Sequence, residues 1–532
     1  MDVTPPGKSA CAGEALPGGP EEPLRLPAET EPGLAPAEAT PEVAAPRRPA
    51  RSMLVYSAGI LASKLASVIL VPLYTHRLTQ AQYGTLELLD VTIQAASKLM
   101  WEGLPFAFWY FYTQRNPGRD RNRVVSTGAL GALGVGSAGA LLGMALAPQI
   151  SALLWGSARN ALLVRISFAG LASAYPLEIL IAWLRIIDAP VKCVASGIGR
   201  LVVQTAGAVV LLVVCGMGIA GVLWSSLLAG SALAGVLLVY TLSRTGLAFE
   251  PRLFGRMLAY ATPSIFVGLC SFLIHFGDRY FLVRYVPLSE LAIYSLAYKF
   301  GMLITLMQYA FQGYWNAQVF HIAKGPTSGE VLGRALTYLT LALCGATVAI
   351  TAFVKPALRL VAPPSYEASA PLVPLICAGY VAFGLSSYFQ TLFYVRKRTA
   401  SDAIVNGAGA LVVGVAYAAL IPRYHLWGAA AATLLGFVAT LAIGGWWSGR
   451  FITFDREWGR LLKVAAASAT MVAVSLCLPL HSIYAQIGVG ALVVLAYPAL
   501  LYATGFFDQS ERRQLREWLR RARLATGLAA DR

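Results

Sequence analysis

The stretch LAYATPSIFVGLCSFLIHFGDRYFLVR, residues 258–284, indicates which kind of fold this chain can form. Most of it is apolar, and a helix of about 20 such residues crosses the roughly 30 Å hydrocarbon core of a bilayer. Its last part nevertheless carries His275, Asp278 and Arg279. A charged side chain at membrane depth costs at least about 2.5 kcal/mol, so such groups normally face water or a partner. The stretch therefore predicts a transmembrane helix with one end in a polar pathway.

The same apolar character continues along most of the chain. Of the 532 residues, 57% are hydrophobic and only 13% are charged, which is far from the composition of a soluble domain. We expect an all-α, polytopic membrane protein with about fourteen transmembrane helices. The apolar segments lie approximately at 53–75, 86–112, 124–147, 161–184, 201–216, 219–242, 258–284, 291–318, 335–354, 371–394, 402–421, 426–447, 464–480 and 484–504.

The positive charge follows the connections between these segments. The formal net charge is +16, and most Lys and Arg residues fall in the even-numbered connections, as in 115–123, 185–200, 244–256, 396–398 and 450–463. By the positive-inside rule, this asymmetry places both termini in the cytoplasm of a multi-pass protein of the cytoplasmic membrane. Topology therefore accounts for the basic balance, and no nucleic-acid partner is expected.

The segments group into a predicted domain organisation. The first 52 residues are rich in Pro, Ala and Glu and are expected to form a disordered cytoplasmic tail. Asp508 and Glu511 can form a capping box at the start of a basic amphipathic helix on the cytoplasmic leaflet. The predicted units are a tail at 1–52, six-helix bundles at 53–242 and 258–447 joined by a linker at 243–257, two additional helices at 448–504, and a basic tail at 505–532.

Polar residues recur at helical spacing inside several spans, most clearly in the first, second, seventh and eighth. This half-to-half repetition is typical of transporters built from two related bundles. The set has a small cationic surplus, which suits an anionic ligand, although structural ion pairs between neighbouring helix turns are the alternative. The candidate cavity residues are Lys64, Asp90, Lys98, Glu102, His275, Asp278, Arg279 and Lys299.

Three tryptophans beside these stripes, Trp101, Trp109 and Trp315, are candidates to line a glycan path, with core or interface packing as the alternative. Arg284 and Tyr285 stand where the seventh span leaves the lipid, which favours snorkelling and interface anchoring.

The seven cysteines are scattered without C-x-x-C spacing, so no metal site is expected. Nor does the chain contain a catalytic motif or a long loop, and we expect it not to be an enzyme.

Four stretches resemble helix junctions of Wzx-type polysaccharide-export flippases, in the multidrug/oligosaccharidyl-lipid/polysaccharide (MOP) superfamily. Each is loose alone, but together they keep the order of helices over 53–504. They are LASKLASVILVPLYTHRLTQAQYGTLELLDV (61–91), GDRYFLVRYVPLSELAIYSLAYKFG (277–301), PSYEASAPLVPLICAG (364–379) and LIPRYHLWGAAAATLLGF (420–437).

The resemblance implies two six-helix bundles related by a pseudo-twofold axis, plus two extra helices, that alternate between inward-open and outward-open states. It further implies a substrate: a polyprenyl-pyrophosphate-linked oligosaccharide turned to the outer face for O-antigen, capsule or exopolysaccharide synthesis. The basic cavity positions of the family match Lys64, Lys98, Arg279 and Lys299 here. The implied partners are this glycan, membrane lipid, and the polysaccharide polymerase and co-polymerase.

Other functions remain open at this point. The acidic residues of the set could bind a coupling H⁺ or Na⁺, while no organic cofactor is expected. A lipid II flippase or drug exporter of the same superfamily is the first alternative, and the basic residues count against drug export. A membrane-embedded glycosyltransferase or ligase is the second, and it would need a catalytic cluster in a substantial outer loop.

Overall fold

The computed structural model describes residues 70–323, 328–396, 398–452, 457–478, 482–508, 511 and 513. These residues form helices and connections and contain no strand, which confirms the predicted all-α class. The predictions for the tail at 1–52, for most of the first span including Lys64, and for the amphipathic helix after residue 513 lie outside the described residues.

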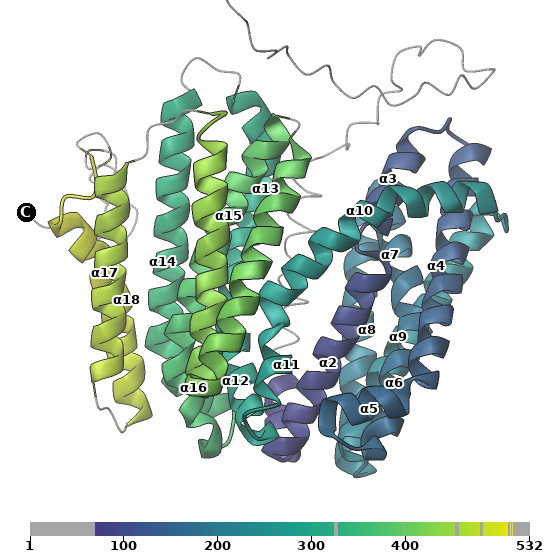
Figure 1. The fold of residues 1–532 in the computed structure, drawn as a ribbon, viewed down its shortest axis with the longest axis horizontal. Helices are drawn as coiled ribbons and strands as arrows, with labels where there is room; N and C mark the ends of the chain where they lie inside the picture. Colours follow the sequence, from purple (N-terminus) through teal and green to yellow (C-terminus); the bar gives the residue numbers. More distant parts are fainter. Residues whose placement is uncertain are drawn as a thin grey trace, which may run out of the picture. The chain divides into compact units, whose positions relative to one another are not determined.

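The first half of the chain consists of helices joined by short connections (Figure 1). Before α2, residues 70–77 are helical, and Thr79 and Gln82 then form a capping box in which each side chain bonds the other's backbone N–H. The elements are α2 (Gln80–Trp101), α3 (Leu104–Thr113), α4 (Arg119–Ala145), α5 (Ala147–Trp155), η1 (Ala158–Asn160), α6 (Ala161–Ala169), α7 (Leu171–Ile186), α8 (Pro190–Ala208), the π-helical η2 (Val209–Val214) and α9 (Gly218–Thr245).

The second half continues in the same way. A proline in the first turn opens α10, where its missing N–H leaves no donor unsatisfied. The elements are α10 (Pro251–Phe276), α11 (Asp278–Leu282), α12 (Leu288–Gly301), α13 (Ile304–Ile322), α14 (Ser328–Val361), η3 (Pro364–Leu372), α15 (Val373–Val395), α16 (Thr399–Ser448), α17 (Trp458–Cys477) and α18 (Ile483–Ala503).

Two pairs of predicted segments that nearly adjoin in the sequence are separated by turns in the structure. Gly216 and Gly218, both at positive φ, separate α8–η2 from α9, as the predicted glycine turn requires. Within α16, His425 has non-helical angles of φ 49° and ψ −121°, which divides this long element at the predicted boundary near residue 425. A Cβ on Gly428 would lie 2.3 Å from the Leu420 carbonyl oxygen, so the chain folds tightly back there.

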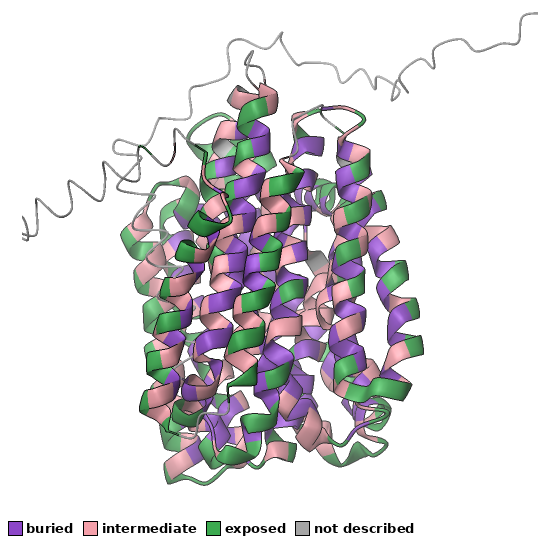
Figure 2. Ribbon diagram, turned by 90° about the vertical axis from the view of Figure 1, so that its left-hand side faces the viewer, coloured by how far each residue is buried: buried purple, intermediate pink, exposed green. Residues whose placement is uncertain are grey.

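Eleven helices among the described residues are long and apolar enough to cross a membrane, and α16 counts as one of them. The protein is therefore a multi-pass membrane protein, while the number fourteen stays a prediction. Large apolar side chains are exposed along these helices, for example Val236 and Val239 on α9, at 67% and 71%. Figure 2 shows that exposed residues follow the outward helix faces. Many of them are large and apolar, where a soluble protein would place polar groups. Lipid is the natural environment of these faces.

The helices pack into groups that follow the chain. One buried apolar cluster holds α4, α6, α7 and α9 together, and a second, larger one joins α2 to α12, α14, α15 and α16. Helix α10 contacts α2 and α3 as well as α16, so it links the two halves. The last two helices, α17 and α18, pack against α14 through a separate small cluster.

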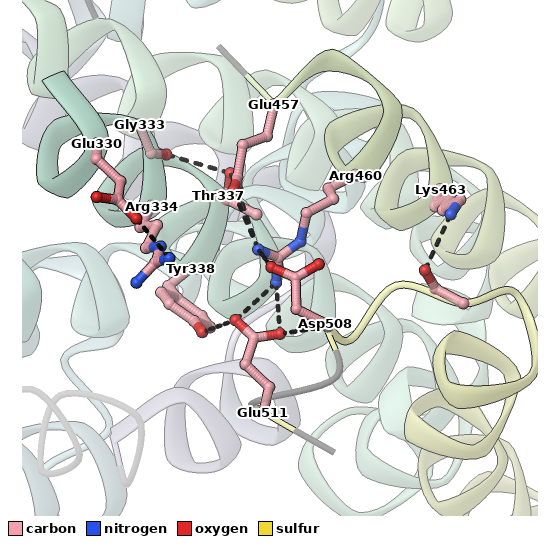
Figure 3. A network of polar contacts seen from close by, with 11 residues as sticks. Glu330, Gly333, Arg334, Thr337, Tyr338, Glu457, Arg460, Lys463, Asp508 and Glu511 are labelled. Atoms are coloured by element: carbon pink, nitrogen blue, oxygen red, sulfur yellow. Dashed lines mark hydrogen bonds and ion pairs between the residues drawn. The ribbon is translucent and has the colours of Figure 1, made fainter. Parts of the chain in front are cut away.

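A polar network fixes the end of the described chain to α14 and α17 (Figure 3). At its centre, the Arg460 guanidinium lies 3.1 Å from Glu457 and 2.9 Å from Glu511, and the Asp508 N–H donates to Glu511 at 2.9 Å. The latter bond is half of the predicted capping box. Burial alone raises the pKa of the Glu511 carboxyl, but the hydrogen bonds from Tyr338, Asp508 and Arg460 outweigh it and hold this pKa below its usual range.

Candidate functional site

Helix α2 of the first half meets the second half along a contact line that we call the seam. The Thr75 hydroxyl, just before α2, donates to the Val361 carbonyl at 2.7 Å, and the Gln80 amide donates to the Ser365 carbonyl at 2.9 Å. Gly84 comes so near α12 that an added Cβ would lie 2.1 Å from the backbone oxygen of Leu288. These contacts bring the odd-numbered connections of the chain together, at the end that the charge pattern predicts to face outward.

A cavity of about 580 Å³ lies behind the seam, between α2, α6, α7, α8 and α9. We call it the first-half cavity. Its walls are mainly apolar, and among the described residues its charged lining consists of two acidic and two basic side chains, Glu87, Asp90, Arg200 and Lys299. Its size is within the range of roughly 300–1,000 Å³ that is usual for ligand sites.

Lys299 connects the seam with this cavity. Its ammonium, carried by α12 of the second half, lies 2.5 Å from the Glu87 carboxylate of α2 and donates to the Tyr83 hydroxyl at 2.8 Å. The Tyr83 side chain is fully buried and meets the Tyr366 ring edge-on at 6.1 Å. The Lys299 side chain remains 37% exposed, toward the cavity that it lines. One cation therefore contacts both halves and is partly exposed in the cavity.

Lys98 and Glu102 form the ion pair that their spacing predicts, on the last turn of α2. They line a separate cavity of about 270 Å³ that is bordered by α3 and α7. Glu178 of α7 lines the same cavity, and the Tyr175 hydroxyl donates to the Ser97 carbonyl beside it at 2.9 Å. This pair thus lies apart from Asp90 and Lys299.

Asp278 and Arg279 are buried inside the second half, where they are 0% and 3% exposed. The guanidinium contacts its neighbour's carboxylate at 2.9 Å and lies 4.5 Å from the centre of the Tyr298 ring. The other carboxylate oxygen accepts from the Tyr294 hydroxyl at 2.5 Å. In this conformation the pair is enclosed by protein. It lines neither of the two cavities above, nor a third cavity that lies between α13, α15 and α16.

The remaining candidates occupy different surroundings. His275 lies among aromatic rings, with Phe383 at 4.5 Å and Phe437 at 4.8 Å. Trp315 is 3% exposed and stacks between Phe311 and Tyr388, whereas Trp109 is 39% exposed on α3. The side chain of Trp101 lies outside the described part of the chain.

A third cavity, of about 390 Å³, is bordered by α13, α15 and α16. We call it the second-half cavity. Asp402 provides its one charged lining group among the described residues, and the other lining residues are Gln312, Asn316, Phe320, Ser387, Gln390, Thr391 and Tyr394. The Tyr394 hydroxyl donates to Asp402 Oδ2, and the Asn406 amide donates to Oδ1, both at 3.0 Å. The carboxylate is therefore held in place.

The sequence interpretation missed several of these residues. Glu87 stands one turn before Asp90 on the same stripe of α2, so extending that stripe by one turn would have found it. Tyr83 extends it by a further turn. Asp402 is the first residue of the predicted span 402–421 and follows the basic run at 396–398, so nothing in the sequence marked it as a cavity residue. Only the fold brings it against α13 and α15.

Solved structures with the same fold define the class. The lipid II flippase MurJ, in an inward closed conformation, matches with a TM-score of 0.70 at 14% identity, over 85% of this chain and 99% of that chain. An inward-facing multidrug resistance MATE family transporter of the MOP superfamily matches with a TM-score of 0.57 at 14% identity, over 78% and 96%. A MOP superfamily transporter from Pyrococcus furiosus reaches 0.55 at 13% identity, over 78% and 96%. The chain has the fold of a MOP superfamily transporter.

The sequence comparison specifies this further. Residues 50–311 match the family model described as polysaccharide biosynthesis protein. The predicted resemblance to the polysaccharide-export branch of the MOP superfamily is thereby confirmed. No curated protein matches the chain in sequence.

Proposed function

We propose that this protein flips a polyprenyl-pyrophosphate-linked oligosaccharide from the cytoplasmic to the outer face of the cytoplasmic membrane by alternating access, for the synthesis of a surface polysaccharide. The observation that carries the proposal is the position of Lys299, which belongs to the second half and yet lines the first-half cavity. The family match over residues 50–311 supports the substrate class.

The proposed cycle starts from the conformation with a closed seam. A pyrophosphate entering the first-half cavity competes with Glu87 for the Lys299 ammonium, and Arg200 offers a second cation in the lining of the same cavity. Each phosphate contact that replaces the Glu87 contact removes an interaction that crosses the seam. Binding would therefore favour separation of α2 from α12, and the glycan could then leave on the far side.

Asp90 has a separate role in this proposal. It lines the same cavity as Lys299, one turn along α2 from Glu87, and it forms no ion pair with another described residue. A carboxylate in such a place can take up a coupling H⁺ or Na⁺ when the lysine turns to the substrate. The chemistry thus consists of binding and movement, without a catalytic step.

The experiment that tests this function is deletion of the gene, with complementation by the wild-type chain and by Lys299→Met. We expect lipid-linked repeat units to accumulate on the cytoplasmic side and one surface polysaccharide to disappear in the deletion strain. Complementation by the wild type should restore both, and Lys299→Met should restore neither at equal protein level. Normal surface polysaccharide in the deletion strain would exclude the proposed function.

Lipid II export is the second candidate, because the MurJ structure shares the fold over nearly its whole length. Lipid II also carries a pyrophosphate, so the first-half cavity suits both substrates. Accumulation of lipid II with lysis of the depleted cells would favour this candidate over repeat-unit export. The polymerase and co-polymerase remain proposed partners of the first candidate only.

A further inference from the structure

We propose that the second-half cavity binds an uncharged sugar unit of the transported glycan and disfavours an acidic sugar at that place. This inference rests on the proposed function and assigns the carbohydrate part of the substrate to a defined wall of the protein. The first-half cavity, with Lys299 and Arg200, is left for the pyrophosphate.

Two facing polar stripes form this cavity. On α13, Gln312, Asn316 and Phe320 follow each other at intervals of four and share one helix face. On α15, Ser387, Gln390, Thr391 and Tyr394 form the second stripe at intervals of three or four. Side-chain amides and hydroxyls can each donate and accept hydrogen bonds, which matches the hydroxyl groups of a sugar.

The α13 amides are available for a ligand. Within the described part of the chain, the side chains of Gln312 and Asn316 form no hydrogen bond, although both line the cavity. Phe320 is 44% exposed on the same face and offers an aromatic surface for the C–H face of a sugar ring. Lipid could not satisfy two free amides, since an unpaired polar group in hydrocarbon is costly. A polar ligand or water is therefore their natural partner.

The charge of the cavity selects among sugars. Asp402 lines it, held by Tyr394 and Asn406, and no cation is among the described lining residues. A uronic acid or another acidic sugar would place a second negative charge against this carboxylate, and the described lining offers no cation to compensate it. A neutral hexose or an N-acetylhexosamine avoids this repulsion.

The location and size of the second-half cavity suit a first contact with a lipid-linked glycan that arrives from the cytoplasmic side. Helix α15 begins next to η3 at the seam, and the cavity lies near its other end, beside the connections that the charge pattern predicts to be cytoplasmic. The cavity is therefore at the end remote from the closed seam. Its volume of about 390 Å³ is small for a ligand site, which suits a short part of an oligosaccharide.

The test measures sugar binding to the purified full chain by ligand-detected NMR titration. The neutral probes are chitobiose, lactose and maltose, and the acidic probe of similar size is digalacturonate. We expect at least one neutral probe to bind more tightly than digalacturonate. Gln312→Leu and Asn316→Leu should each weaken that binding by roughly three- to tenfold, as expected for lost hydrogen bonds. Asp402→Asn should improve the binding of digalacturonate.

Gln114→Leu, which alters an exposed amide after α3 in the first half, is the matched control and should leave sugar binding unchanged. If a leucine variant fails to purify as a folded protein, Asn316→Ala replaces it. The inference is overturned if no neutral probe binds the wild type, or if Gln312→Leu and Asn316→Leu bind as the wild type does. The gene-deletion result is independent of this titration, so a failure of the sugar site and a failure of the proposed function are distinguishable.

Discussion

Gly84 allows a direct test of the seam. A Cβ added there would lie 2.1 Å from the carbonyl oxygen of Leu288 and 3.0 Å from its carbonyl carbon. Both atoms belong to the backbone of α12, so a change of side-chain rotamer cannot relieve the clash. Because ordinary contact begins near 3.4 Å, the substitution Gly84→Ala forces α2 and α12 apart by roughly 1 Å.

The expected cost follows from this overlap. Overpacking a well-packed contact costs about 1–3 kcal/mol, while alanine in a helix recovers up to about 1 kcal/mol relative to glycine. We therefore expect a lower thermal midpoint for Gly84→Ala. If the strain is relieved when the seam opens, the equilibrium between closed and open seam should shift toward the open state by roughly five- to a hundredfold.

Cross-linking measures the closed state. In a cysteine-free background, Gln80→Cys and Ser365→Cys place thiols on the two sides of the seam, where the native side chain and carbonyl lie 2.9 Å apart. A short bifunctional maleimide should join them less completely in the Gly84→Ala variant. Gly134→Ala on α4 is the control, because a Cβ there meets no atom within 4 Å. The same thermal midpoint and cross-linking yield in Gly84→Ala as in the parent would refute the close contact.

Three further predictions concern the charged groups. Lys299→Met and Glu87→Gln should each lower stability, and a double-mutant cycle should give a coupling free energy of about 1 kcal/mol; strictly additive effects would show that the pair does not interact. Arg279→Met should reduce the amount of folded protein in the membrane, because an unpaired buried charge costs about 3–5 kcal/mol; normal abundance with lost export would instead give this arginine a transport role. The pKa of Glu511 is lowered in the folded protein, so its stabilising contribution is present above its ordinary pKa and disappears as the pH falls through the folded value. A spin label at Arg513→Cys should thus become more mobile on acidification, an effect that Glu511→Gln should remove and that a pH-independent spectrum would contradict.

The sequence was sufficient for the helices and their turns. Apolar segments of membrane length predict the long described helices, because the bilayer imposes one length and one backbone solution on every span. The short elements α5 and η3 fall mainly in predicted connections, where this constraint does not act. The break at His425 and the glycine turn at Gly216 were predictable for the same reason. The continuous apolar stretch around each of them is too long for one span.

The sequence was not sufficient for the pairing of charges. Periodicity places Asp278, Arg279 and Lys299 on helix faces, but it does not show what each face meets. The partner of Lys299 is Glu87, more than two hundred positions away, and only the packing of α2 on α12 brings them together. Asp278 and Arg279 have the same apparent pattern, yet neighbouring rings and helices cover them completely.

This difference divides the buried charges into two functional groups. Asp278 and Arg279 form an ion pair within the second half, and separating them would cost several kcal/mol, so they should stay paired when the halves move. Lys299 and Glu87 lie on opposite halves, and the partial exposure of Lys299 to the cavity limits their net contribution to about 1 kcal/mol. A ligand can shift a conformational equilibrium only by its difference in affinity for the two states. In the proposed cycle, the ion pair across the seam is consequently weak enough for a pyrophosphate to displace, while each half retains the interactions that keep it rigid.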